Sequence, residues 1–244
     1  MRAYELMKET FLRKNYVRIE HISWLAIYGL LFLIPFTSEV WKWGPFLFIW
    51  SGCVLPILLS AGIFGDDIAS GRICVLVTKP FWLRELYIYR LMGLSLQAVL
   101  HLVLAGCIIF ILHSGTGRGS IDNLGLWILS SWLVFNTWAA LSTSLSVVVR
   151  REYNSLLLFV GIGFVYFLVG MLMTFYRDHA AADVFIGFLR YACPPVELLF
   201  KLAIGKYSLI KSVACVIHSL ALTAIYGIVG VVILSKREFK FQPD

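Results

Sequence analysis

The chain has 244 residues, of which 60% are hydrophobic and only 14% are charged, and its mean hydropathy is +0.84. A soluble domain of this length needs more polar surface, so the composition indicates an integral membrane protein. The formal net charge of +7 does not indicate nucleic-acid binding, because the basic residues lie beside apolar stretches rather than in a patch with polar, base-reading side chains.

The first 20 residues predict an amphipathic helix on the inner membrane surface. Tyr4, Met7 and Phe11 recur at helical spacing, and charged residues lie between them. A frayed, charged tail is the alternative, because short isolated helices are marginal in water. The apolar run that follows has no small-residue cleavage site, so we expect no cleaved signal peptide.

Six apolar stretches are long enough to cross a bilayer, since a spanning helix needs about 20 residues. We therefore predict an all-α polytopic membrane protein, with residues 1–244 in a single transmembrane domain. The first stretch is the shortest of the six. The predicted spans are residues 21–37, 46–64, 91–112, 124–149, 154–176 and 212–234.

Residues 177–211 are also rich in apolar side chains, but they predict an outer segment that does not cross. The segment contains Arg190, Glu197 and Lys201, and each charge at mid-membrane costs about 2.5 to 3.5 kcal/mol on insertion scales. Pro194 and Pro195 also remove backbone donors that lipid cannot replace. We predict two short helices broken at these prolines, lying in the interface or dipping into the membrane.

Basic residues set the expected orientation. With six spans, most of the 21 Lys and Arg residues fall on the side that carries both termini. The positive-inside rule then places both termini in the cytoplasm, where anionic lipid attracts the basic residues. We therefore expect a multi-pass protein of the inner (cytoplasmic) cell membrane.

The common catalytic and nucleotide-binding motifs are missing from the sequence. There is no His-Glu-x-x-His motif, and Gly205–Lys206 lacks the earlier glycine of a phosphate-binding loop. The five cysteines are scattered, without the spacing of a zinc site. We expect no catalytic residue, no metal and no cofactor on this chain.

The histidines leave one enzymatic alternative, a haem- or quinone-binding membrane subunit. Four of the five histidines lie in or near predicted spans, and membrane cytochromes hold haem between imidazoles on facing helices. At about 1.5 Å of rise per residue, His101 and His218 would differ in depth by roughly 9 Å. That difference does not favour a shared haem.

Polar residues inside the spans are candidates for a substrate pathway. Gln97 and His101 are four residues apart and share one face of the third span, and the fourth span contains Asn136 and Thr143. Intramembrane polar groups tend to face a bundle interior or a water-filled path. The alternative is that they only bond a neighbouring helix.

The connection between the predicted second and third spans is the most informative stretch. Residues 65–90, here called the coupling segment, read GDDIASGRICVLVTKPFWLRELYIYR. Acids follow the span, Thr78-Lys79-Pro80 breaks a short apolar run, and Arg84-Glu85 opens a new helix. This pattern predicts a compact helical elbow at the membrane surface, and the alternative is an ordinary solvated loop.

The coupling segment resembles the permease subunits of type-2 ABC transporters. In that family the corresponding stretch reads roughly G-E-E-x-x-x-G-T-L-x-L-L-L-T-K-P-V-S-R-x-E and ends in G-K. The chain departs from the pattern at Arg72, Cys74 and Trp82-Leu83, and Arg84 falls one step late. The matching positions are Asp66, Asp67, Gly71, Leu76, Thr78, Lys79, Pro80, Glu85 and Arg90.

The resemblance implies a non-enzymatic permease subunit of an ATP-driven exporter. In the family, two six-span permeases pair as a homodimer or heterodimer around the pathway, and each docks to a cytoplasmic ABC ATPase that binds ATP and Mg. The resemblance does not identify the substrate. A structural membrane subunit without a transport role is a further alternative. The resemblance implies ATPase contacts at Asp66, Asp67, Gly71, Arg72, Thr78, Lys79, Pro80, Phe81, Trp82, Arg84 and Glu85.

Overall fold

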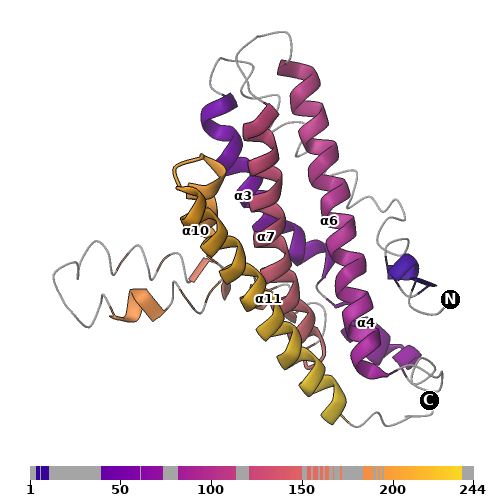
Figure 1. Ribbon diagram of the computed structural model, residues 1–244. Coiled ribbons are helices and arrows are strands. Elements are labelled where there is room, and N and C mark those ends of the chain that lie inside the picture. The colour runs from indigo at the N-terminus through magenta and orange to yellow at the C-terminus, as the bar shows by residue number, and fades with distance from the viewer. Residues whose placement is uncertain are drawn as a thin grey trace.

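The computed structural model contains helices and turns, with no strand among the residues that it describes. Those residues are 4, 5, 7–10, 40–60, 62–73, 82–113, 121–149, 153, 154, 156–158, 160, 161, 163, 164, 167, 171, 184–188, 191, 193 and 195–237. The helices labelled in Figure 1 are α3 (Val40–Leu59), α4 (Gly65–Ala69), α6 (Leu83–His113), α7 (Ile121–Ser146), α10 (Val196–Ala203) and α11 (Leu209–Lys236).

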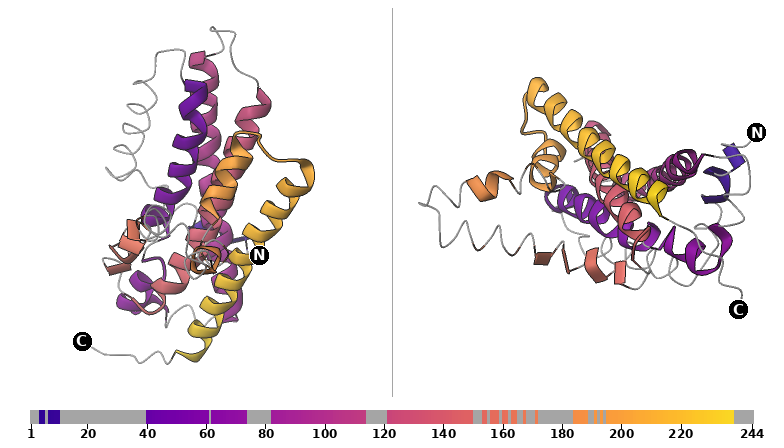
Figure 2. Two further views of the ribbon diagram at one scale, coloured as in Figure 1. Left: turned by 90° about the vertical axis from the view of Figure 1, so that its left-hand side faces the viewer. Right: turned by 90° about the horizontal axis from the view of Figure 1, so that it is seen from below.

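Four long helices form an elongated bundle with α7 at its centre. In Figure 1, α3, α7 and α11 run from the upper to the lower end, whereas α6 runs in the opposite direction. α7 packs against α3, α6, α10 and α11. Accordingly, 61% of an 18-residue apolar stretch of α7 is buried, compared with 17% of the corresponding stretch of α11. α11 lies across one side of the bundle (Figure 2).

Three helices are long and apolar enough to cross a membrane in the part of the chain that the structure describes. They are Leu83–Ile111, Leu124–Ser146 and Leu209–Lys236, and they correspond to the predicted third, fourth and sixth spans. The prediction of an all-helical membrane protein is therefore confirmed at this coarser level. The described apolar part of α3, Gly44–Ile57, is shorter. Residues 21–37 and much of 154–176 lie outside the described residues, so six spans are not established.

Two helix ends differ from the bounds of the predicted spans. α6 begins at Leu83, before the predicted third span, in agreement with the predicted helix opening at Arg84-Glu85. Arg90 therefore lies within the helix, where it pairs with Asp67. α3 ends at Leu59 rather than Phe64, because the chain turns at Gly62, which has a φ of 78°. These two shifts bring the end of α3, α4 and the first turns of α6 together at the lower end of the bundle (Figure 1).

The predicted break before the last span is present. Residues 184–188 are helical, and α10 begins directly after Pro195. Leu199, Leu202 and Ala203 of α10 are buried against α3 and α7, so α10 is part of the bundle rather than a helix lying on its surface. A turn at Gly205 then leads into α11.

Candidate functional site

The coupling segment is described in two parts, residues 65–73 and 82–90. They form the lower end of the bundle in Figure 1, together with the last turns of α7 and α11. Gly71 has a φ of 66° and turns the chain after α4. The predicted contact residues Thr78, Lys79, Pro80 and Phe81 lie outside the described residues.

α4 is attached to two spans through the residue that precedes it. The backbone N–H of Phe64 donates a hydrogen bond to Ser146 Oγ of α7 at 3.4 Å. The Phe64 ring stacks on Tyr87 of α6, with the ring centroids 5.5 Å apart. Within the elbow, Ser70 Oγ donates to the Asp66 carbonyl at 2.7 Å. The two described parts of the predicted elbow, α4 and the start of α6, are therefore in contact with each other and with α7.

A buried ion pair joins α4 to α6. Arg90 Nη2 lies 2.8 Å from Asp67 Oδ2, and both side chains are at most 1% exposed. The resemblance implies Asp67 as a surface contact to an ATPase, and that assignment needs correction, because the carboxylate faces the protein interior. Arg90, expected to close a surface segment, is likewise buried. Desolvating two charges is costly, so each depends on its partner.

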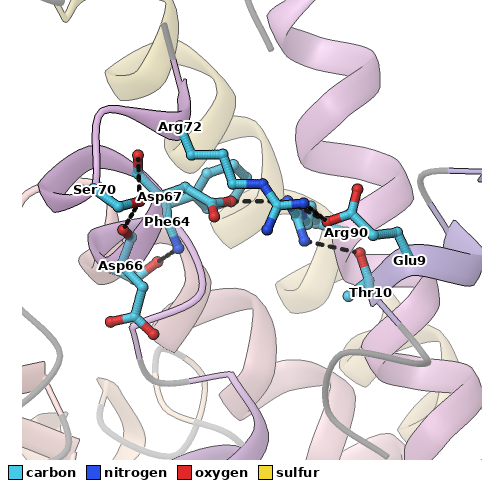
Figure 3. A network of polar contacts seen from close by, with 9 residues as sticks. Glu9, Thr10, Phe64, Asp66, Asp67, Ser70, Arg72 and Arg90 are labelled. Carbon is cyan, nitrogen blue, oxygen red and sulfur yellow. Dashed lines mark hydrogen bonds and ion pairs between the residues drawn. The ribbon is translucent and has the colours of Figure 1, made fainter. Parts of the chain in front are cut away.

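The N-terminal helical segment, residues 4, 5 and 7–10, completes this network (Figure 3). Glu9 Oε1 lies 2.5 Å from Arg72 Nη2 and 3.6 Å from Arg90 Nη2. Arg90 Nη1 donates to Thr10 Oγ1 at 3.3 Å. Two acids and two arginines thus meet at one place. Neither Glu9 nor Thr10 could be identified as a contact residue from local patterns, because Glu9 and Arg72 are 63 residues apart.

The start of α6 presents an exposed aromatic residue. The Trp82 backbone N–H donates to Glu85 Oε2 at 3.4 Å, which is half of a capping box. This contact agrees with the prediction that Arg84-Glu85 opens a helix. The Arg84 guanidinium lies 5.0 Å from the Trp82 ring centroid, and Trp82 is 66% exposed. Asp66 is half-buried and Arg72 is exposed, so this end of the bundle offers a mixed charged and aromatic surface.

The candidate pathway residues lie on two neighbouring helices. Gln97 on α6 is fully buried, and His101 Nδ1 lies 2.8 Å from the Gln97 carbonyl oxygen, so the two share a face as predicted. On α7, Asn136 Nδ2 donates to the Trp132 carbonyl of its own helix at 2.9 Å. Thr143 is fully buried. The Asn136 side chain therefore bonds its own helix and not a neighbouring one through this contact.

Other polar side chains of α7 bond to neighbouring helices. Ser131 Oγ donates to the Phe48 carbonyl of α3 at 2.5 Å. Ser144 Oγ donates to the Tyr226 carbonyl of α11 at 2.7 Å and lies 2.8 Å from the Tyr87 hydroxyl of α6. These contacts hold three helices to α7, as polar side chains do in membrane bundles. The only sequence signal for them is that α7 is rich in Ser and Thr.

Two of the four histidines weighed for haem have described side chains, and each has a contact within the protein. His101 contacts Gln97 as above, and the His218 ring lies edge-on to Tyr191, with centroids 5.7 Å apart. The side chains of His21 and His113 lie outside the description. Among the described residues, no three or more His, Cys, Asp or Glu side chains lie together in a group that could hold a metal ion.

No protein-family model and no curated protein sequence matches the chain.

Proposed function

We propose that this chain is the membrane-spanning permease subunit of an ATP-driven exporter of the type-2 ABC class. The observation that carries the proposal is the elbow at one end of the bundle. Its core is fixed by the buried Asp67–Arg90 pair, whereas Trp82 projects beside it with 66% of its surface exposed. A large aromatic on a fixed elbow suits binding to another protein, and the family pattern makes a cytoplasmic ATPase the proposed partner.

The helix directions support six crossings. Thr10 contacts Arg90 near the lower end of α6, but α3 begins at the upper end (Figure 1). α7 and α11 both run downward, so the chain between them also has to return to the upper end. Residues 21–37 and 154–176 are the apolar stretches in these two connections. We propose that these complete six spans, with both termini in the cytoplasm.

Cysteine labelling tests this topology. In a background without native thiols, Ser208→Cys before α11 should react with a membrane-impermeant maleimide in intact cells. Ser70→Cys in the elbow and Ser235→Cys at the end of α11 should react only after permeabilisation. All three positions are exposed, so burial does not confuse the result. Labelling of Ser70→Cys from outside, or of Ser208→Cys and Ser235→Cys from one side, would contradict the topology.

A continuous set of contacts links the elbow to the spans. Phe64 stacks on Tyr87, the Tyr87 hydroxyl contacts Ser144, and Ser144 bonds α11. Motion of the elbow would therefore reach α6, α7 and α11 together. This supports a role in which ATP-driven movement of the partner rearranges a pathway between this chain and a second permease. Gln97 and His101 remain the proposed pathway residues, with Asn136 and Thr143.

Trp82→Ala tests the docking role. Because an exposed aromatic anchor at the centre of an interface typically contributes about 2 kcal/mol, we expect ATPase affinity to fall roughly 30-fold. Arg84→Glu should have the same direction of effect, since it also removes the cation over the indole ring. Both variants are measured by the amount of ATPase that copurifies and by the rate of ATP hydrolysis in membranes. Glu85 is left unchanged because it caps α6.

Trp50→Ala is the matched control. Trp50 is also exposed, at 46%, but it lies in the middle of α3 rather than at the elbow. It should leave ATPase binding unchanged. If Trp82→Ala and Arg84→Glu both retain full ATPase association, hydrolysis and export, then the elbow is not the docking site.

A further inference from the structure

Among residues 4, 5 and 7–10, the N-terminal helical segment contacts α6 through the polar side chains of Thr10 and Glu9. Tyr4 is 60% exposed and Met7 is half-buried. The side chain that is buried there is the polar Thr10, at 1% exposure. A helix this short is not stable alone in water. Its position therefore depends on what Glu9 and Thr10 bind.

Glu9 bridges two arginines that belong to different elements. Its carboxylate contacts Arg72, which follows α4, and Arg90, which lies within α6. The Glu9–Arg72 contact is partly open to water, with side chains 33% and 43% exposed. Exposed ion pairs contribute little and weaken with salt. The Glu9–Arg72 contact is therefore the one that opens more readily than the Glu9–Arg90 contact.

The same segment covers the buried ion pair. Thr10 Oγ1 accepts a hydrogen bond from Arg90, so the segment supplies one of its acceptors. Next to it, a Cβ added at Gly93 would lie 2.9 Å from the Met7 carbonyl oxygen and 2.9 Å from Thr10 Cβ. Gly93 thus allows the segment to lie directly against α6. Without the segment, Arg90 would lose this acceptor and this cover.

We infer that residues 4, 5 and 7–10 act as a reversible strap held by charge. When the strap is closed, Glu9 ties the elbow to α6 through Arg72 and Arg90, and the Asp67–Arg90 pair stays dry. When it opens, Arg72 is released from Glu9, and the Asp67–Arg90 pair loses the cover and the acceptor that the strap supplies. The link to ATPase coupling rests on the proposed function, but the opening itself does not.

Thiol labelling measures whether the strap opens. In a background without native cysteines, Thr10→Cys places a similar-sized side chain at the buried contact. Its reaction rate with a soluble maleimide, in purified full-length protein, reports how often the contact opens. Adding Glu9→Gln should raise the rate about tenfold, because one carboxylate then no longer holds either arginine. Raising the salt from about 0.1 to 1 M should accelerate the parent and leave the Glu9→Gln protein little changed.

Glu5→Gln is the matched control, since it removes the same charge from an exposed position of the same segment. It should label at the parent rate. Equal rates for Glu9→Gln and Glu5→Gln, without a salt effect, would overturn the strap. So would a parent rate equal to that of the exposed Glu5→Cys. Neither result depends on the ATPase, so the strap and the docking role of Trp82 fail in separate experiments.

Discussion

Replacing Arg90 with leucine should lower the free energy of unfolding by about 3 to 5 kcal/mol, because it leaves the Asp67 carboxylate buried without its partner. Arg90 is fully buried and lies 2.8 Å from that carboxylate. The change also removes the donor to Thr10. We expect a clear drop in thermal stability in detergent, measured by aggregation or circular dichroism, and a smaller drop for Arg90→Lys.

Two controls distinguish the effect of leaving Asp67 unpaired from the effect of removing an arginine. Arg84→Leu removes an exposed arginine of the same helix and should change stability by less than about 0.5 kcal/mol. The double variant Asp67→Asn with Arg90→Met should be more stable than Arg90→Leu, because it leaves no unpaired buried charge at position 67. If the effects of Asp67→Asn and Arg90→Met simply add, the two side chains do not stabilise each other.

Gly230→Ala should separate α11 from the helices beside it. A Cβ at this position would lie 2.4 Å from the Tyr87 hydroxyl and 2.5 Å from Ser144 Oγ. Those two groups also contact one another, and Ser144 bonds the Tyr226 carbonyl, so they cannot move without breaking buried hydrogen bonds. Overpacking of this kind costs about 1 to 3 kcal/mol, and each buried polar group left without a partner adds about 1 to 3 kcal/mol.

Gly227→Ala is the matched control on the same helix. Among the described residues, no atom outside the helix's own backbone lies within 4 Å of a Cβ there, so alanine should be neutral or slightly stabilising. In the Gly230→Ala protein, Tyr87→Leu should cost less than in the native protein, because it removes the ring atoms that clash. The unfolding temperatures of the native protein, the two single variants Gly230→Ala and Tyr87→Leu, and their double variant measure this coupling. Equal stability of Gly230→Ala and Gly227→Ala would mean that α11 does not approach Tyr87 this closely.

Local sequence signals were enough for the helical class and for several elements. Hydropathy over a window of about 20 residues finds spanning helices, and it placed α6, α7 and α11. The adjacent prolines placed the break before α10, and Arg84-Glu85 marked the start of α6. Each of these signals depends only on residues near one another in the chain, which is why a single sequence could determine them.

Contacts between distant segments were decided only by the tertiary structure. As a surface acid, Asp67 looked like a partner contact, because nothing local distinguishes an exposed carboxylate from one that faces an arginine 23 residues away. Glu9 and Thr10 could not be found for the same reason. In the sequence, Ser144 does not differ from the other small polar residues of α7. Only the packing shows that it lies between Tyr87 and α11. Burial and pairing depend on which helix faces meet, and hydropathy and periodicity do not encode which partner a helix face receives.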